Sequence, residues 1–402
     1  MVRLGRARML MGGSALLWGL QFAFLTPSIG LILVALYSAT PAQVGWALAI
    51  YNISGFVSTL IVPTRADRRG DYLKPLLGCG LATILLASAL AVASSLPWAV
   101  LALVALGGPA GVGIGLLFAH QKHIGTSVSG IMKTRAIFSF SWVAGPPIAA
   151  FMIGLLGKRS ILWAVAGIAA LGLVMTVMLM QERTRSEALR PASDDDEAEV
   201  VEDSGDSVLA VLRQPRVLML SLAFLALLGT VSASVATVSL YVTDRLGTNV
   251  IWAGVALATC AGLEIPVLLS LGRLSQRFGA SLLLLVGALC GVGYYSLLVV
   301  AASPVVLVAG QLLNAVFIAT VSGLGLTIFQ EVVPWPGLAS GLFMNTQRLG
   351  AVLAGPIVAL GALPGLGYAW VYAVCAPLVV LGVLLLAWAR RLSRRALASR
   401  LA

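Results

Sequence analysis

The sequence predicts an all-α membrane protein with twelve transmembrane helices in two pseudo-symmetric lobes of six. Hydrophobic residues make up 59% of the 402-residue chain and charged residues 10%, whereas a soluble domain is about 45–50% apolar and about 25% charged. The apolar residues form twelve long runs, and one acidic stretch separates six runs from six. Because so few polar residues cannot cover a water-exposed surface, this composition excludes a soluble enzyme, a disordered chain and a secreted disulfide scaffold.

Each apolar run has about the 20 residues that a helix needs to cross a bilayer. The first run is too long for the apolar core of a signal peptide, so we interpret it as the first span. Gly, Ser and Ala recur within the runs, and such small residues let membrane helices approach closely. The predicted spans are 11–37, 43–64, 73–94, 97–119, 131–154, 160–180, 215–241, 250–273, 280–302, 304–329, 338–362 and 366–389.

The acidic stretch defines the domain organisation. From Glu182 to Asp206 the chain carries ten acidic residues, three arginines and no aromatic residue. Such a segment is too polar to compensate for the entropy cost of ordering, which predicts a flexible linker. The sequence therefore predicts an N-terminal lobe at 1–181, an acidic cytoplasmic linker at 182–214 and a C-terminal lobe with a basic tail at 215–402.

Lysine and arginine predict the orientation in the membrane. The chain has a net charge of +11. Most of its basic residues lie at the N-terminus, after spans 2, 4 and 8, and in the C-terminal tail. The loops of the opposite side hold only Lys158, Arg159 and Arg245. Because cytoplasmic loops of membrane proteins are enriched in Lys and Arg, both termini and the linker are predicted to be cytoplasmic. The basic charge thus encodes topology, and we expect no nucleic-acid partner.

The two halves share short sequence features at a nearly constant offset. Ser129-Gly130 precedes Ala144-Gly145-Pro146 in span 5, and Ser340-Gly341 precedes Ala354-Gly355-Pro356 in span 11. The offsets are 211 and 210 residues. This pattern indicates a duplicated six-helix unit, and such transporters bind substrate between the repeats near the midplane.

Two motifs resemble those of the major facilitator superfamily. The loop after span 2 reads Arg65-Ala66-Asp67-Arg68-Arg69-Gly70, which is similar to the family's signature loop between its second and third helices. The resemblance implies a conformational latch in which Asp67, Arg68 and Gly70 take part; an ordinary positive-inside loop is the alternative. Gly145 and Pro146 in span 5 resemble the motif of the family's exporters, and a packing kink is the alternative.

Charges inside spans are rare and costly, so they usually mark a functional cavity or partner. Glu264 lies in the middle of span 8, and Arg135 lies near the cytoplasmic end of span 5. A desolvated carboxylate can titrate near neutral pH, so we predict that Glu264 carries the coupling proton, together with Arg135. For Glu264, substrate binding and a structural ion pair are the alternatives. For Arg135, they are substrate contact, pairing with an acid and snorkelling to the membrane surface.

Amide side chains supply a candidate sugar site, because they both donate and accept hydrogen bonds as sugar hydroxyls do. Trp18, Tyr51 and Phe343 are additional aromatic candidates for covering a sugar ring. For each residue alone, helix packing is the competing interpretation. His120 and His123 are interpreted as loop residues. The predicted substrate-binding residues are Gln21, Asn52, Trp142, Gln311, Asn314, Asn345 and Gln347.

The chain also resembles a narrower group, the bacterial sugar efflux transporters of this superfamily. The resemblance is carried by Trp142-Val143-Ala144-Gly145-Pro146-Pro147, by Ala261-Gly262-Leu263-Glu264-Ile265-Pro266 and by Gln311-Leu312-Leu313-Asn314-Ala315-Val316-Phe317-Ile318. It implies a location in the bacterial inner membrane and proton-driven export of sugars such as lactose, glucose or small glycosides.

The leading hypothesis is therefore a monomeric sugar or glycoside exporter that works by alternating access and proton antiport. Its expected partners are the sugar and the lipid bilayer. No metal ligand cluster, nucleotide-binding loop or catalytic triad is recognisable, so we expect no enzyme activity and no cofactor besides the coupling proton. A multidrug/proton antiporter and a non-transporting membrane sugar sensor are the alternatives.

Overall fold

A computed structural model of the chain describes residues 2–187, 208–249, 251–363 and 367–401. Within these ranges every regular element is a helix. The elements of the N-terminal half are α1 (Val2–Tyr37), α2 (Pro41–Arg69), α3 (Leu73–Val92), α4 (Leu96–Ala102), η1 (Leu103–Gly107), α5 (Gly108–Ala110), α6 (Gly113–His123), α7 (Val128–Leu156) and α8 (Ser160–Glu187).

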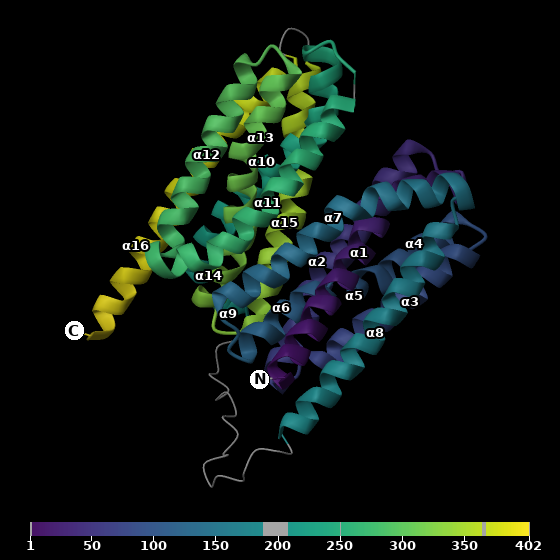
Figure 1. Cartoon of the computed structure of the whole chain (residues 1–402), viewed down its shortest axis with the longest axis vertical. Coiled ribbons are helices and arrows are strands. Elements are labelled where there is room, and N and C mark those ends of the chain that lie inside the picture. Colours follow the sequence, from purple (N-terminus) through teal and green to yellow (C-terminus); the bar gives the residue numbers. More distant parts are fainter. Residues whose placement is uncertain (1, 188–207, 250, 364–366, 402) are drawn as a thin grey trace. The chain divides into compact units, whose positions relative to one another are not determined.

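The C-terminal half follows the same plan (Figure 1). Its elements are α9 (Val208–Leu212), α10 (Pro215–Leu240), η2 (Tyr241–Arg245), α11 (Ile251–Phe278), α12 (Ala280–Val300), α13 (Pro304–Ala319), η3 (Thr320–Leu324), α14 (Gly325–Val332), α15 (Pro336–Ala359), η4 (Leu360–Ala362) and α16 (Ala369–Leu401).

These helices account for all twelve predicted spans. Among the described residues, ten helical stretches are long and apolar enough to cross a bilayer. The other two predicted spans, 131–154 and 338–362, coincide with α7 and α15. Polar residues in the middle of α15, including Asn345 and Gln347, lower its hydropathy. The predicted all-α class, with a helix at each expected segment, is confirmed.

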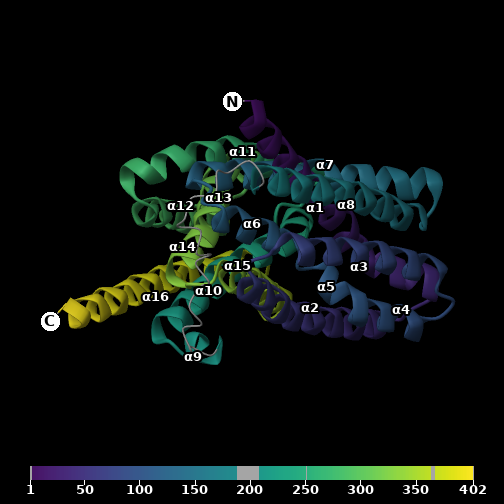
Figure 2. The same cartoon turned by 90° about the horizontal axis from the view of Figure 1, so that it is seen from below.

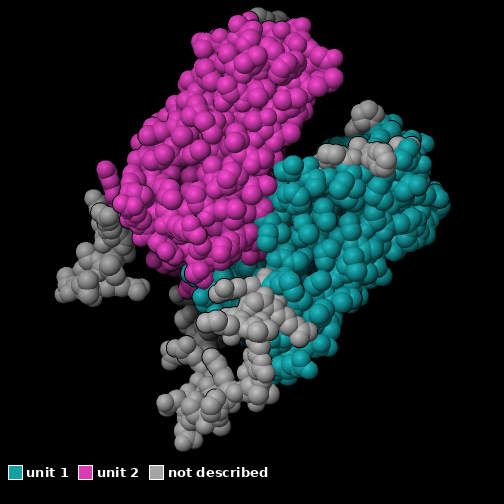
Figure 3. Space-filling view, in the orientation of Figure 1, with its two compact units in different colours: residues 1–126, 137–208, 335–341 teal, residues 127–136, 209–334, 342–402 magenta. Residues whose placement is uncertain are grey.

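The chain divides into two units, coloured teal and magenta in Figure 3. Unit 1 contains Met1–Thr126, Ile137–Val208 and Trp335–Gly341, and unit 2 contains Ser127–Ala136, Leu209–Pro334 and Leu342–Ala402. The first residues of α7 therefore belong to unit 2, and the first residues of α15 belong to unit 1. Most of the predicted acidic linker lies outside the described residues. Helix α8 extends to Glu187, past the predicted start of the linker at residue 182. The predicted lobe boundaries themselves stay a prediction.

Unit 1 packs its helices through small residues. A side-chain carbon at Gly145 of α7 would lie 2.5 Å from the Ala23 Cβ of α1. A carbon at Gly80 of α3 would lie 2.7 Å from Leu173 of α8. Helix α8 packs against both α1 and α3, and Figure 2 shows α2, α3 and α5 side by side. Because lipid tails are as apolar as leucine, such close backbone approach supplies the packing energy that holds the helices together.

Unit 2 has an aromatic core. Tyr295 and Tyr372 stack with ring centroids 6.2 Å apart, and Tyr241 meets Tyr372 edge-on at 5.1 Å. The Tyr241 hydroxyl donates a 2.7 Å hydrogen bond to the Leu298 carbonyl. Helix α16 packs against α10 and α12, and α13 packs against α11 and α12. The Tyr241 hydroxyl is thus paired inside the helix bundle, where an unpaired hydroxyl is costly.

The fourth and tenth spans are interrupted helices. The fourth contains a π-helical turn at Leu103–Gly107, then Pro109, and a break at Gly111 and Val112. The tenth contains a π-helical turn at Thr320–Leu324. Proline removes a backbone donor, and π-helical turns are frequent at functional sites. The interruption in the fourth span lies beside the pocket described below.

Candidate functional site

Asp67 near the end of α2 caps the start of α15. Its carboxylate is only 9% exposed and accepts hydrogen bonds from the backbone N–H of Gly337 at 2.7 Å and of Leu338 at 2.8 Å. Gly337 and Leu338 are the second and third residues of α15. Backbone amides in the first turn of a helix have no hydrogen-bond partner within that helix. The Tyr72 hydroxyl donates a third hydrogen bond to Asp67 at 2.6 Å. A negative charge at a helix N-terminus is stabilising, so this carboxylate fixes α15 to α2 within unit 1.

Two glycines make this geometry possible. Gly70 ends α2 with a φ of +60°, and its N–H bonds to the Asp67 carbonyl. Only glycine adopts that conformation without strain, and the turn brings Tyr72 back to Asp67. A side-chain carbon at Gly337 would lie 2.6 Å from the Pro63 carbonyl and 2.8 Å from the Asp67 carboxylate. Arg68, the other predicted member of the motif, is exposed.

Asp71, which the sequence analysis did not single out, caps the next helix. Its carboxylate accepts from the N–H groups of Leu73 and Lys74 at 3.1 and 3.4 Å. It also lies 3.2 Å from the Lys74 ammonium and 3.7 Å from the Arg183 guanidinium at the end of α8. Partial burial raises the pKa of Asp71, but the hydrogen bonds and the Lys74 charge outweigh it and hold that pKa below its usual value.

The predicted position of the histidines was wrong for His120. This residue lies in α6 and is buried, because the fourth span continues four residues beyond its predicted end at 119. His123 ends the same helix, and its ring lies 5.2 Å from the Tyr72 ring.

Burial and the neighbouring Asp67 charge raise the pKa of Tyr72. The Tyr72 hydroxyl therefore remains a hydrogen-bond donor to the Asp67 carboxylate at physiological pH.

The predicted motif in span 5 lies within a continuous helix. Helix α7 runs through Gly145 and Pro146 without interruption. Gly145 is buried against Ala23 of α1, which explains why this position has no side chain.

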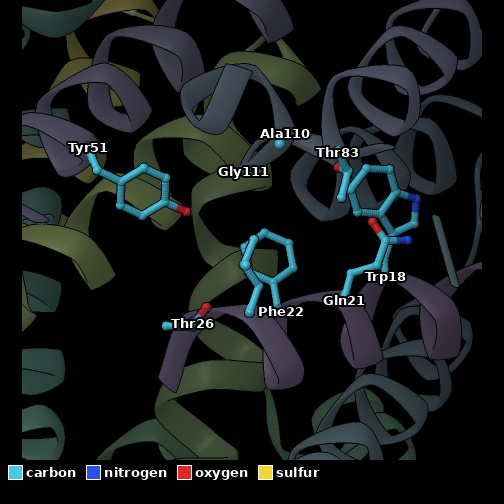
Figure 4. Close-up of a pocket in the computed structure, with 9 residues that line it drawn as sticks. Trp18, Gln21, Phe22, Thr26, Tyr51, Thr83, Ala110 and Gly111 are labelled. Atoms are coloured by element: carbon cyan, nitrogen blue, oxygen red, sulfur yellow. The ribbon is translucent and has the colours of Figure 1, made fainter. Parts of the chain in front are cut away.

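Gln21 lies in a pocket inside unit 1 (Figure 4). Its enclosed volume is about 20 Å³, which is room for about one water molecule. Trp18 and Gln21 of α1, Tyr51 of α2 and Thr83 of α3 line it. Gln21 is 3% exposed and Trp18 is 2% exposed. Neither the amide atoms of Gln21 nor the indole nitrogen of Trp18 has a hydrogen-bond partner among the described residues.

The other unit 1 candidates do not line this pocket. The Asn52 amide donates a 2.9 Å hydrogen bond to the Leu48 carbonyl of its own helix. Trp142 of α7 is 40% exposed. The structure therefore brings together Gln21 and the aromatic candidates Trp18 and Tyr51, but not Asn52 or Trp142.

Unit 2 contains a buried chain of polar side chains. The Gln311 amide donates to the Tyr294 hydroxyl at 3.0 Å, and the Asn314 amide donates to the Gln311 oxygen at 2.9 Å. The Asn314 amide also contacts the Cys260 sulfur of α11 at 3.5 Å. Predicted residues Gln311 and Asn314 thus share one face of α13, whereas Tyr294 and Cys260 were not predicted. A hydroxyl and a thiol in apolar runs carry no sequence signal for such a network.

The predicted charge pair comes together in the same unit. Arg135 lies in the part of α7 that belongs to unit 2 and is 7% exposed. Its guanidinium is attracted electrostatically by the Glu264 carboxylate on α11. Glu264 is half-buried and lies one helical turn after Cys260. The acid therefore lies at one end of the Tyr294–Gln311–Asn314–Cys260 network.

The candidates on α15 have separate surroundings. Asn345 is buried and Gln347 is half-buried. Phe343, proposed to cover a sugar ring, is fully buried against Phe224 and Phe329, with ring centroids 6.0 and 5.8 Å away. Its surroundings are those of a core residue, because its ring is already covered within unit 2.

Comparison with known protein families shows which family the chain belongs to. The model of the Major Facilitator Superfamily matches residues 11–355. The chain belongs to the major facilitator superfamily. Family membership confirms the resemblance inferred from the Asp67 loop. It also confirms that the chain is a multi-pass membrane protein of a transporter family and not an enzyme.

Curated relatives match nearly the full length of this superfamily member. It is 28% identical over 354 residues to sugar efflux transporter A of Escherichia coli (strain K12), which covers 85% of this chain and 86% of that protein. It is 29% identical over 363 residues to sugar efflux transporter A of Dickeya chrysanthemi, covering 87% of each. It is 26% identical over 359 residues to sugar efflux transporter B of Salmonella typhimurium, again covering 87% of each.

Solved superfamily structures share the fold. A structure of the Escherichia coli fucose:proton symporter FucP matches with a TM-score of 0.75 and 14% identity, covering 95% of this chain and 98% of that chain. The human organic anion transporter MFSD10 matches with a TM-score of 0.70 and 18% identity, covering 95% and 99%. These likenesses confirm the predicted fold class of two six-helix lobes.

Proposed function

We propose that this chain exports sugars or small glycosides across the bacterial inner membrane by alternating access and proton antiport. The observation that carries this proposal is that relatives named as sugar efflux transporters match 85–87% of the chain. In this proposal the protein acts as a monomer with both termini in the cytoplasm, as the distribution of Lys and Arg predicts.

The polar groups inside the helices support a hydroxyl-rich substrate. Gln21 presents an unpaired amide in unit 1, and Gln311 and Asn314 form an amide pair in unit 2. Amides both donate and accept, which matches neighbouring sugar hydroxyls. Asn345 and Gln347 on α15, together with Asn52 and Trp142, remain candidates for further contacts.

Glu264 and Arg135 are the proposed proton-coupling pair. Protonation of Glu264 would remove the attraction that it exerts on buried Arg135. A proton would thereby change the interactions of unit 2, and a ligand can shift a conformational equilibrium only through such a difference. A membrane potential of 100 mV contributes ~2.3 kcal/mol per charge moved, which is sufficient to drive a sugar gradient.

Asp67 is the proposed latch. Its three hydrogen bonds hold the first turn of α15, which comes from the C-terminal half, against α2. In an alternating-access cycle this cap would form in one state and release in the other. Arg68, Gly70, Gly145 and Pro146 complete the proposed conformational motif.

The test is sugar uptake into everted membrane vesicles carrying either Glu264→Gln or the control Glu331→Gln. Glu331 is an exposed acid at the end of α14, so the same substitution there leaves the proposed coupling pair intact. We expect Glu264→Gln to abolish proton-driven accumulation and Glu331→Gln to retain it. Full accumulation by Glu264→Gln would remove this acid from the mechanism.

Two alternatives predict different results in the same cells. A multidrug antiporter would expel ethidium and would not move sugars. A membrane sugar sensor would bind sugar without flux, and deletion of residues 186–206 would abolish its output. Deletion of the same segment from a transporter should spare transport.

A further inference from the structure

The pocket around Gln21 lies entirely within unit 1. Its lining comes from α1, α2, α3 and the interrupted fourth span, all within residues 18–111. Its enclosed volume of about 20 Å³ exceeds the ~10–15 Å³ that one water molecule needs and is far below the ~300 Å³ at which ligand pockets begin. The size of the space therefore suits a single water molecule.

Three buried polar side chains meet at one side of this pocket. Buried polar groups in proteins almost always have a hydrogen-bond partner, because an unpaired one costs free energy. The Gln21 amide and the Trp18 indole N–H have no such partner among the described residues. Thr83 is 3% exposed, and its hydroxyl donates to the Cys79 carbonyl at 2.9 Å, so its oxygen can still accept. Figure 4 shows Gln21, Trp18 and Thr83 on the same side of the pocket.

The donors and acceptors of these three side chains match those of one water molecule. The Trp18 indole nitrogen can only donate, whereas the Gln21 amide oxygen and the Thr83 hydroxyl oxygen can accept. A water molecule accepts the first hydrogen bond and donates the other two. It thereby makes three hydrogen bonds, which is the typical number for a water buried in a protein.

The lining also argues against an ion. None of its nine residues is charged, so a cation or an anion would be buried here without a counter-charge, which is costly. The Trp18 N–H in addition presents its positive end to the space, which disfavours a cation. A neutral molecule that both donates and accepts is therefore the ligand that this chemistry selects.

The interruption in the fourth span shapes this space. The Trp18 ring lies against Gly113, where any side-chain carbon would overlap it, and a carbon at Gly107 would lie 2.7 Å from the Tyr51 ring. Gly111, at the break itself, lines the pocket. Within a membrane, interrupted helices are tolerated where neighbouring helices, polar side chains and ordered water supply hydrogen bonds. A water beside this break has the surroundings in which such molecules are found.

We propose that one internal water molecule is a constant component of unit 1, accepting from the Trp18 indole N–H and donating to the Gln21 and Thr83 oxygens. The water joins α1 to α3 beside the interruption in the fourth span. A water-mediated hydrogen bond is nearly as favourable in enthalpy as a direct one. It therefore supplies a contact between helices for which the surrounding lipid offers no hydrophobic driving force. The water site does not depend on the proposed substrate, because unit 1 alone provides its contacts.

The test is hydroxyl-radical labelling of the purified full-length protein, without sugar, followed by mass spectrometry. An X-ray pulse converts water into hydroxyl radicals, which oxidise the side chains next to that water. Each labelling rate is divided by the rate for the same residue in the unfolded protein. Trp18 should be oxidised although it is 2% exposed, whereas Phe343, which is fully buried among other rings, should be protected. Equal protection of Trp18 and Phe343 in the folded wild type would overturn the proposal without any variant.

Two threonines provide a matched pair of variants. Thr83 and Thr176 are both buried and both donate to the carbonyl four residues earlier in their own helix, at 2.9 Å. Only Thr83 lines the pocket. Thr83→Val should therefore reduce the oxidation of Trp18, and Thr176→Val should leave it unchanged.

Gln21→Met removes both polar atoms of the amide and keeps an unbranched side chain. It should lower the oxidation of Trp18 to the protected level of Phe343. If Trp18 is oxidised equally in the wild type, Gln21→Met and Thr83→Val, the radicals come from other water and the proposed site is wrong. Because the assay contains no sugar, this result would leave the proposed sugar export unaffected.

Discussion

At the scale of single residues, Asp67 illustrates how one buried carboxylate joins distant parts of a chain. It accepts three hydrogen bonds, two of them from backbone amides about 270 residues away in the sequence. Hydrogen bonds to a charged group contribute about 1.5–3 kcal/mol each, roughly twice those between neutral groups. The position of the first turn of α15 against α2 therefore depends strongly on this charge.

Replacing Asp67 by Asn tests that dependence. The amide keeps the size but loses the charge and presents donors toward the N–H groups of Gly337 and Leu338. We expect a loss of about 1–3 kcal/mol in the free energy of unfolding and strongly reduced transport, measured by thermal unfolding and vesicle uptake. Asp71→Asn is the control on the same loop and should affect transport much less. Equal effects of the two substitutions would contradict a special role for Asp67.

Asp71 gives a prediction about pH. Its pKa in the folded protein is lower than the ordinary value of 3.8, so the folded state favours the charged carboxylate. This contribution to stability is therefore complete above pH 3.8 and is lost as the pH falls through the lowered folded value. The difference in melting temperature between wild type and Asp71→Asn should be present at pH 7 and shrink toward pH 3. A difference that is independent of pH would contradict the ion pairing with Lys74 and Arg183.

At the scale of helices, backbone contact at Gly341 sets how closely α15 approaches α2. Any side-chain carbon at Gly341 would overlap the Thr59 carbonyl oxygen, and a backbone atom cannot rotate away. Gly341→Ala should therefore destabilise the protein and impair transport, although alanine otherwise favours a helix. Gly167→Ala in α8 is the matched control, because nothing lies within 4 Å of its added carbon. If both alanine variants keep wild-type unfolding temperature and uptake, the close contact between α15 and α2 is not required.

The polar network between α11, α12 and α13 makes a second helix-scale prediction. Asn314→Leu removes the hydrogen bonds to Gln311 and Cys260. Interhelical hydrogen bonds in membrane proteins contribute about 0.6 kcal/mol on average, with a maximum of about 1.7. We expect a loss of stability within that range in detergent unfolding, together with weaker sugar binding. Unchanged sugar binding would restrict the network to a structural role.

Element positions were largely predictable, whereas the contacts between elements were not. Runs of apolar residues predict spans directly, because a bilayer requires about 20 of them. The hydrogen bonds of Asp67 to Gly337 and Leu338 were not predictable, since backbone amides carry no residue-specific signal. Gln21 was predictable as a polar residue in a span, but its unpaired state depends on neighbours from three other segments. The extension of α6 that buries His120 was missed because hydropathy falls before the helix ends.

At the scale of the whole molecule, each unit contains a short segment from the other half of the chain. Unit 2 takes in Ser127–Ala136 with Arg135, and unit 1 takes in Trp335–Gly341 with the amides that bind Asp67. One member of the proposed coupling pair, Arg135, and the amides that bind the proposed latch residue Asp67 therefore lie in these segments. In a transporter that alternates between two states, such segments are the places where a protonation event can be converted into a change of partner.

The most direct test of the account is sugar accumulation in everted vesicles, measured with labelled glucose and lactose, with and without a proton gradient. We predict accumulation that depends on the gradient, collapses with an uncoupler and disappears in Glu264→Gln. No accumulation of either sugar in vesicles that contain folded protein would contradict proton-driven sugar export.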